Sequence, residues 1–210
     1  MENLKKFIDK KTNANELYKD IFIIKDHAYA TESHILVRKK LQENTPESEQ
    51  PNESVKSNIL SMFAGVKYNN VLKASESLKI LSRYKTEPIY RTYEKRCKAC
   101  NNSGYVEFEF CYDGKTYFED CECPVCMGNC GTITDWNNII DYGYNFNTLV
   151  KIEGKLFKAE FIDLVLSTFS DVEIAIIKQM LYFKTDKYEG FLMENLGSDE
   201  CVIIELKYGS

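Results

Sequence analysis

The stretch CKACNNSGYVEFEFCYDGKTYFEDCECPVCMGNCG, residues 97–131, holds seven of the eight cysteines of this 210-residue chain. Two Cys-x-x-Cys pairs stand out, Cys97/Cys100 and Cys123/Cys126, and 22 residues separate them. Each pair can form a tight knuckle whose two sulfurs point at one ion, and Zn²⁺ prefers four such ligands in a tetrahedron. The spacing therefore predicts a zinc site built from these four thiols.

The segment between the two pairs has the alternation of a β-hairpin. YVEFEFCY (105–112) alternates apolar residues with glutamates, and KTYFED (115–120) is its expected partner strand. Asp113-Gly114 lies between them and suits a tight type I′ turn. Knuckle, strand, turn, strand and knuckle form the layout of a zinc ribbon, so we expect residues 96–130 to be a zinc-binding hairpin inserted into a larger domain.

Three further cysteines lie in the same stretch. Cys121 and Cys130 flank the second knuckle, and either can replace one of the four ligands. Cys111 falls in the middle of a strand and is interpreted as a packing residue or as a bystander without a role in the site. A redox couple at Cys123/Cys126, as in thioredoxin-type proteins, is an alternative to the metal site, although no βαβ pattern opens a helix at Cys123.

The cysteine stretch resembles the zinc domain of DnaJ-type cochaperones, which repeats Cys-x-x-Cys-x-Gly-x-Gly. CKACNNSG keeps the later glycine as Gly104 and has Asn102 in place of the first. CPVCMGNC keeps the first glycine as Gly128 and has Cys130 in place of the second. The family uses four such repeats for two zinc ions, whereas this chain has two repeats and no His-Pro-Asp signature of a J-domain. The resemblance implies a shared way of holding zinc.

The composition excludes several classes of protein. With 44% hydrophobic and 28% charged residues the chain can bury a core, and its longest apolar runs are far too short to cross a bilayer. Met1 is followed by a polar segment, so we expect a cytoplasmic protein with reduced thiols and no membrane partner. The net charge is −5, so any contact with nucleic acid has to come from a local basic patch.

Charge is distributed unevenly along the chain. Residues 1–40 carry nine Lys or Arg against six Asp or Glu, whereas residues 42–54 carry four Glu and no base. Segment 42–57 is polar, acidic and contains proline, which predicts a flexible loop. The candidate contacts with nucleic acid are basic residues near the start of the chain and in the strand before this loop: Lys5, Lys6, Lys10, Lys11, Arg38, Lys39 and Lys40. A solvated surface is the alternative interpretation for all of them.

The N-terminal part is predicted to combine helices with short strands. A helix runs from Leu4 to about Lys10, and residues 58–83 are expected to be helical in two pieces. The expected strands are 21–24, 28–31 and 35–39. Helix and antiparallel strands are thus predicted for this half of the chain.

The last 60 residues repeat that plan. KAEFIDLVLSTF (158–169) is predicted to be a helix with a broad apolar face. Four short strand segments follow it: VEIAII, MLYFKTD, YEGFLME and CVIIELK. The predicted fold class is therefore α+β, with residues 1–95 and 131–210 forming one domain around the inserted hairpin.

Both halves resemble the half-domains of DNA sliding clamps, in which a helix and antiparallel strands occur twice per domain. ATESHILV (30–37) resembles the Ala-Thr-Asp-Gly-His-Arg-Leu strand of the bacterial clamp, with Glu32 for Asp and Ser33 for Gly. VKIEGKLFKAEFIDLVLSTF resembles the strand and helix that open a half-domain, and LYFKTDKYEGFLMEN resembles its closing strands. The resemblance implies one clamp-like domain, whereas a bacterial clamp subunit has three, and the zinc hairpin has no counterpart there.

The leading hypothesis is a non-enzymatic, nucleic-acid-associated adaptor with a structural zinc ion, because the chain shows no phosphate loop, HExxH motif or nucleophile elbow. Its expected partners are DNA and a protein that binds the sheet or the hairpin. The sequence leaves open whether the chain forms a homo-oligomer. One alternative is a zinc module that binds proteins or peptides. Its docking face would consist of the hairpin aromatics Tyr105, Phe108, Phe110, Tyr117 and Phe118. The other alternative is a thiol redox protein.

Overall fold

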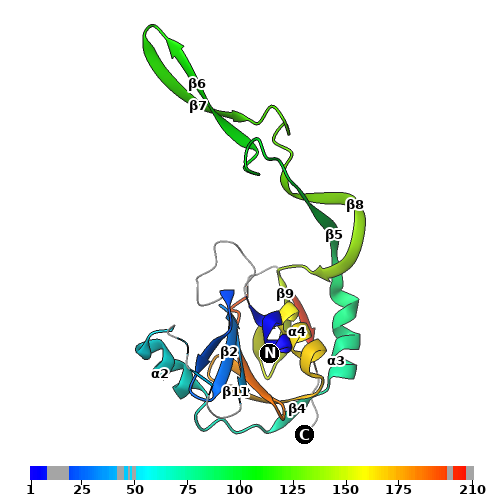
Figure 1. The fold of residues 1–210 in the computed structure, drawn as a ribbon. Helices are drawn as coiled ribbons and strands as arrows, with labels where there is room; N and C mark the ends of the chain where they lie inside the picture. Colours follow the sequence, from blue (N-terminus) through cyan, green and yellow to red (C-terminus); the bar gives the residue numbers. More distant parts are fainter. Residues whose placement is uncertain (9–18, 42–44, 47, 49–50, 198–200, 207–210) are drawn as a thin grey trace. The chain divides into compact units, whose positions relative to one another are not determined.

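The computed structural model describes residues 1–8, 19–41, 45–46, 48, 51–197 and 201–206 (Figure 1). The chain divides into two units. Unit 1 comprises residues 1–85 and 144–210, and unit 2 comprises residues 86–143. In the described parts of the chain, no helix is long and apolar enough to cross a membrane.

Unit 1 is built on a seven-stranded antiparallel sheet with the order β1-β2-β3-β13-β12-β11-β4. Strands from the two ends of the chain meet where β3 pairs with β13, with Leu36 opposite Phe191 and Lys39 opposite Tyr188. The strands are β1 Phe22–Ile24, β2 His27–Glu32, β3 Ile35–Lys40, β4 Asn70–Leu72, β11 Val172–Ile177, β12 Met180–Lys184 and β13 Tyr188–Met193. The mixture of helix and antiparallel sheet expected for an α+β protein is thus confirmed.

A second, three-stranded sheet has the order β10-β9-β14. Its strands are β9 Thr148–Ile152, β10 Lys155–Lys158 and β14 Val202–Glu205. β14 pairs with β9 in parallel. The fourth C-terminal strand predicted from the sequence is therefore present, but it joins this smaller sheet rather than the large one.

The helices differ in part from the prediction. They are the 3-10 helices η1 Glu2–Phe7 and η2 Ser82–Tyr84, and the α-helices α2 Glu53–Met62, α3 Ala74–Leu81 and α4 Ala159–Phe169. The first helix ends at Phe7 because Ile8 is extended, so its predicted end at about Lys10 is wrong. The flexible loop predicted for 42–57 is wrong from Glu53 onward. There Asn52 caps α2 by accepting a hydrogen bond from the backbone N–H of Val55, 3.1 Å away.

The large sheet is buried on both faces. Side chains alternate across a strand, so Ala28 and Ala30 of β2 pack on one side and Tyr29 packs on the other. α2 covers the Tyr29 side, where it contributes Ile59 and is followed by Phe63. η1, α3, α4 and the small sheet cover the opposite side, and α3 packs against α4 (Figure 1).

One position of the large sheet has no room for a side chain. Gly190 of β13 lies opposite Phe183 of β12. A Cβ atom at Gly190 would lie 2.6 Å from the carbonyl oxygen of Leu36 and would also collide with the Phe183 ring. The close packing of β3, β13 and β12 therefore depends on a glycine here.

Asp163 on α4 holds the two residues at which the chain leaves and re-enters unit 1. Lys85 Nζ lies 3.0 Å from Asp163 Oδ2, and the Tyr144 hydroxyl donates to Asp163 Oδ1 over 3.1 Å. Burial, followed by the negative charge of Asp163, raises the pKa of Tyr144, so the phenol remains a donor at neutral pH. Lys85 Nζ also lies 5.4 Å from the centre of the Tyr144 ring. We call this contact set the Asp163 junction.

Unit 2 consists of two antiparallel ribbons and a cluster of cysteines. β5 Lys85–Lys95 pairs with β8 Gly131–Tyr144, and β6 Tyr105–Tyr112 pairs with β7 Lys115–Glu122. Asp113 and Gly114 connect β6 to β7 with φ of 48° and 69°. Positive φ at both central residues is the property of a type I′ turn, so the hairpin predicted from the sequence is confirmed.

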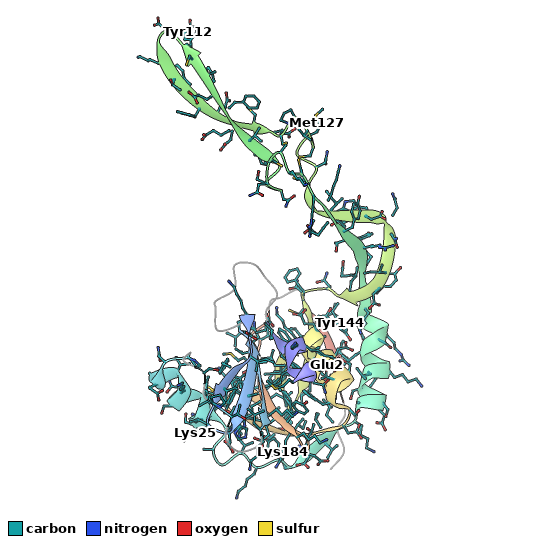
Figure 2. The ribbon with its side chains drawn as sticks, viewed as in Figure 1. Glu2, Lys25, Tyr112, Met127, Tyr144 and Lys184 are labelled. Atoms are coloured by element: carbon teal, nitrogen blue, oxygen red, sulfur yellow. The ribbon has the colours of Figure 1, made fainter. Side chains whose placement is uncertain are left out.

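Unit 2 has almost no apolar interior. Throughout residues 86–143, all of which the structure describes, the buried residues are Cys97, Cys100, Gly104 and Cys123. Most other side chains of the ribbons project into solvent, as Tyr112 does at the hairpin tip (Figure 2). Isolated two-stranded ribbons are marginally stable at best, and within this fully described unit the cluster around Cys97, Cys100 and Cys123 is the one group of packed buried side chains.

Candidate functional site

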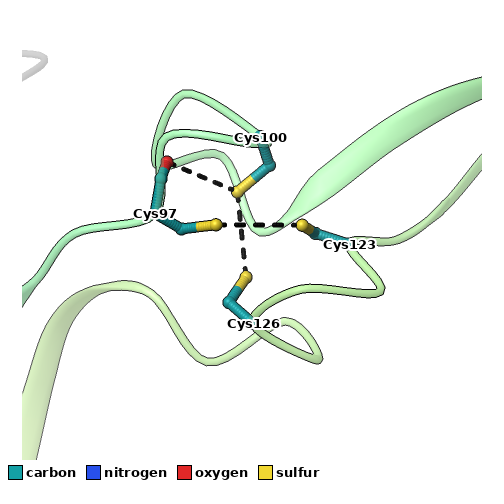
Figure 3. Close-up of side chains that lie close together, drawn as sticks. All are labelled: Cys97, Cys100, Cys123 and Cys126. Carbon is teal, nitrogen blue, oxygen red and sulfur yellow. Dashed lines mark hydrogen bonds between the residues drawn. The ribbon is translucent and has the colours of Figure 1, made fainter.

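The four thiols of the two Cys-x-x-Cys pairs lie together. The Sγ atoms of Cys97, Cys100, Cys123 and Cys126 are all within 4.8 Å of one another. The Cys97–Cys123 sulfurs are 3.9 Å apart and the Cys100–Cys126 sulfurs 3.8 Å apart (Figure 3). Sulfurs at ~2.3 Å from a tetrahedral zinc ion would be about 3.8 Å from one another. The four sulfurs therefore have the spacing of a closed thiolate site and can hold a metal ion.

The backbone shapes both knuckles in the same way. The N–H three residues after the second cysteine of each pair donates to the carbonyl of that cysteine, from Ser103 to Cys100 and from Asn129 to Cys126, over 2.9 Å in each case. Two consecutive residues with positive φ follow each pair: Asn101 and Asn102, then Met127 and Gly128. The two knuckles thus present their sulfurs with matching local geometry.

Gly104 and Gly128 bring the two knuckles into contact. A Cβ atom at Gly104, where φ is 80°, would lie 3.1 Å from the Gly128 carbonyl oxygen. The carbonyl of Gly104 also accepts a hydrogen bond from the N–H of Cys123 over 2.8 Å. These contacts hold the two sulfur pairs at the spacing that a tetrahedral ion requires.

The thiols differ in their tendency to ionise. Burial raises the pKa of the Cys100 thiol, but hydrogen bonds from the Gly104 backbone and the neighbouring thiols outweigh it and lower this pKa to about 6. Burial, together with thiol hydrogen bonds, raises the pKa of Cys126 and of Cys130. The Cys100 thiol thus ionises more readily than Cys126 or Cys130, and binding of a divalent metal would release the protons that the ligand thiols carry.

The three additional cysteines of the stretch occupy different surroundings. Cys130 Sγ lies 3.5 Å from Cys100 Sγ, outside the group of four. Cys121 Sγ lies 3.9 Å from the Glu119 carbonyl oxygen, and Cys111 is exposed on β6. Cys130 is therefore a fifth thiol at the centre, which Cys121 and Cys111 do not join.

One face of the hairpin is aromatic. Directly opposed residues share a face, so Phe110 and Tyr117 lie on the same side, and their rings stack 5.4 Å apart. Phe108 and Tyr112 are two residues away from Phe110 on β6 and share this side. These four side chains, between 41% and 71% exposed, form what we call the aromatic face.

The opposite face of the hairpin is acidic. Phe118 lies opposite Glu109, and Tyr105 lies opposite Glu122, so both aromatic residues belong to this second face. The single docking face predicted from Tyr105, Phe108, Phe110, Tyr117 and Phe118 is therefore wrong, because the two-residue period of a strand separates these side chains. Residues 105–122 carry six acidic residues against one lysine, a net charge of −5.

The basic residues at the end of β3 lie beside lysines from far along the chain. Because the end of β3 pairs with the start of β13, the turn that precedes β13 lies next to it. Lys39, Lys40 and Lys187 line one hollow of about 680 Å³. Lys40, Lys184 and Lys187 line another of about 240 Å³. We call Lys39, Lys40, Lys184 and Lys187 the lysine cluster, and no local signal in the sequence joins its two halves.

Arg38, another candidate contact with nucleic acid, lines the smaller hollow, but its guanidinium is held by neighbouring side chains. Its Nε donates to Glu189 Oε2 over 3.0 Å, and its guanidinium carbon lies 3.9 Å from the centre of the Phe63 ring. The side chain is only 15% exposed. Lys5 and Lys6 are exposed on η1, whereas Lys10 and Lys11 lie outside the described residues.

No protein-family model matches the chain, and no curated protein matches it. Solved structures of bacterial sliding clamps are similar to it. They include the DNA polymerase sliding clamp of Bacillus subtilis (TM-score 0.46, 9% identity) and the β clamp of Helicobacter pylori bound to a DNA ligase peptide (0.43, 12%). A third is DNA polymerase III subunit β of Borrelia burgdorferi (0.46, 11%).

The similarity extends over most of this chain and over part of each clamp subunit. It covers 94%, 92% and 93% of this chain in these three comparisons, and 62%, 62% and 63% of the respective clamp chains. The chain thus spans less than two thirds of the length of the clamps to which it is similar.

Proposed function

We propose that this chain is a non-enzymatic, nucleic-acid-associated adaptor built on one clamp-like domain, with a structural zinc ion in unit 2. The lysine cluster is the observation that carries the proposal. Two adjoining hollows are lined by the four lysines and Arg38 against Asp186 and Glu189, so basic residues outnumber acidic ones there although the chain as a whole has a net charge of −5. Lysine ammonium groups bind backbone phosphates without regard to sequence.

The α3–α4 pair is a poorer surface for phosphate than the lysine cluster. The charged residues of these two helices are Glu76, Lys79, Glu160 and Asp163, so acidic residues outnumber basic ones. We therefore assign the phosphate contacts to the surface formed by the end of β3 and the turn between β12 and β13.

A structural role for zinc follows from the number of thiols in the centre. Catalytic zinc sites use three protein ligands and keep a fourth position for water or substrate. Here Cys97, Cys100, Cys123 and Cys126 supply all four corners of a tetrahedron. A centre of this kind offers no open position for a reaction and acts by fixing the fold of unit 2.

The test is the binding of the full chain to a fluorescein-labelled 20-base-pair DNA duplex, followed by anisotropy as a function of salt. Replacing the four residues of the lysine cluster by Gln should weaken binding, and the slope of log K against log salt should become less negative by roughly 3 to 4. The matched control replaces four exposed lysines elsewhere in unit 1 by Gln: Lys67, Lys73, Lys79 and Lys178. A wild-type chain that does not bind, or a control set that weakens binding equally, contradicts the proposal.

The aromatic face favours a second candidate function, the binding of a protein segment. The hairpin forms a sheet of only two strands, and its net charge of −5 suits a basic partner with apolar residues at alternate positions. We therefore expect unit 2 to bind a 12-residue peptide of alternating Lys and Leu. Phe108→Ser/Phe110→Ser should abolish this binding, whereas Tyr105→Ser/Phe118→Ser, on the opposite face, should leave it intact. Equal loss in both double variants argues against a specific face.

A further inference from the structure

We propose that Cys100 and Cys130 form a dithiol that peroxide oxidises to a disulfide, with release of the metal from the four-thiol centre. This inference rests on the proposed zinc centre and adds a modification site to it. The two sulfurs lie 3.5 Å apart, closer than the 3.8 Å and 3.9 Å between the paired sulfurs of the centre itself.

The position of Cys130 shows that the centre does not need it as a ligand. Cys130 comes four residues after Cys126, the last cysteine of the second pair. The residue at the equivalent position of the first pair, four after Cys100, is Gly104, which has no side chain to bind an ion. A tetrahedral ion uses four thiolates, which leaves Cys130 as a free thiol beside a ligand.

Exposure makes Cys130 the accessible member of the pair. Cys97, Cys100 and Cys123 are each at most 6% exposed, whereas Cys130 is partly exposed. The N–H of Cys130 donates to the Gly128 carbonyl over 3.1 Å, which fixes its backbone next to the contact between the knuckles. Cys126 is partly exposed as well, but within the Cys100–Cys130 pair an oxidant of the size of hydrogen peroxide reaches Cys130 before it reaches Cys100.

The reaction takes place in two steps with hydrogen peroxide as the oxidant. In the first, the Cys130 thiol gives up its proton and its sulfur attacks one oxygen of hydrogen peroxide. The O–O bond breaks, a sulfenic acid forms on Cys130, and the other oxygen leaves as water. In the second, the Cys100 thiolate attacks the Cys130 sulfur, the S–S bond forms, and hydroxide departs and takes a proton from solvent. The two sulfurs together lose two electrons, which reduce one peroxide to two waters.

Loss of Cys100 as a ligand opens the centre. A disulfide sulfur carries no negative charge to donate to Zn²⁺, so three ligands remain and the ion is free to leave. Because the buried residues of unit 2 are three cysteines and one glycine, release of the ion removes the feature around which residues 86–143 are ordered. Oxidation at a single pair of sulfurs would therefore change the conformation of the whole unit.

The experiment treats the full zinc-loaded chain with hydrogen peroxide and follows two signals. A chromogenic chelator records released zinc, and mass spectrometry of tryptic peptides identifies the disulfide. We expect release of one zinc ion per chain together with a Cys100–Cys130 link. Cys130→Ser should keep its zinc before treatment and release it about tenfold more slowly. Cys111→Ser and Cys121→Ser are the matched controls and should behave like the wild type.

Three results would overturn the inference. Release from Cys130→Ser at the wild-type rate would show that Cys130 takes no part. A Cys130→Ser chain that lacks zinc before treatment would make Cys130 a ligand. A disulfide between other cysteines, such as Cys123 and Cys126, would mean that Cys100 and Cys130 are not the pair that peroxide oxidises. A wild-type chain purified without zinc refutes the zinc centre instead, and the disulfide mapping on that chain still decides whether Cys100 pairs with Cys130.

Discussion

Gly104 lies so close to Gly128 that a Cβ atom on the first would come within 3.1 Å of the carbonyl oxygen of the second. The two glycines follow different Cys-x-x-Cys pairs, and their contact sets the distance between the pairs. Metal binding by the four sulfurs would therefore depend on these backbone positions as well as on the sulfurs themselves.

Gly104→Ala should lower the affinity of the chain for zinc. The alanine would need both a positive φ, which costs roughly 1 kcal/mol, and a shift of the second knuckle to relieve the contact with Gly128. Gly114→Ala is the matched control, because Gly114 also has positive φ but a Cβ atom added there would have no neighbour within 4 Å. Competition with a zinc chelator measures the affinity of both variants. Equal zinc affinity in both variants would mean that the contact between the glycines is unimportant.

Removal of the metal should unfold unit 2 and leave unit 1 folded. Residues 86–143 have no apolar core, whereas unit 1 has buried side chains on both faces of its large sheet. After treatment with a chelator, hydrogen exchange should become fast throughout β5 to β8 and remain slow in β3, β12 and β13. Unchanged protection of Cys97, Cys100 and Cys123 amides after full metal loss would disprove this expectation.

Arg38→Lys should lower stability without lowering affinity for DNA. The lysine keeps the charge, but it loses the hydrogen bond from Nε to Glu189 and the planar contact with Phe63. We expect a loss of about 1–2 kcal/mol in the free energy of unfolding, measured by urea denaturation. Lys40→Gln should do the opposite, weakening DNA binding with little change in stability. Weaker DNA binding by Arg38→Lys at unchanged stability would instead mean that Arg38 contacts DNA.

Gly190→Ala should destabilise unit 1 by about 1–3 kcal/mol, because the new methyl group would overlap the Phe183 ring and the Leu36 carbonyl. The control is Gly143→Ala, where the nearest atom to the added Cβ is a methyl carbon of Ile89 at 3.4 Å. Thermal unfolding of both variants checks the prediction. If Gly190→Ala unfolds at the same temperature as the wild type, the sheet accommodates the methyl group without loss of stability.

The features predicted well from the sequence are those encoded locally. Asp113-Gly114 and the alternation on either side of it specify the hairpin within a dozen residues, and both residues adopt the positive φ of the expected turn. Each Cys-x-x-Cys pair likewise carries its own turn. The Asn52 cap of α2 was also present in the sequence, but the acidic composition of the preceding segment favoured a loop.

The features that sequence analysis missed depend on pairing between distant strands. Arg38 lies 151 positions before Glu189, its partner across the β3–β13 pair, so its role in packing has no local signature. The same pairing places Lys184 and Lys187 beside Lys40. The sequence alone leaves open whether Cys121 or Cys130 joins the four-thiol site, and the meeting of the two knuckles places only Cys130 beside Cys100.

The Asp163 junction bears on whether the segment between Lys85 and Tyr144 can be deleted from the chain. Lys85 and Tyr144 mark the two exits toward residues 86–143, and both are fastened to one carboxylate of α4. A short bridge of glycine and serine would thus be enough to close the chain after excision of everything between them. We therefore expect unit 1 to fold without residues 86–143, because the buried side chains on both faces of its large sheet all come from outside that segment.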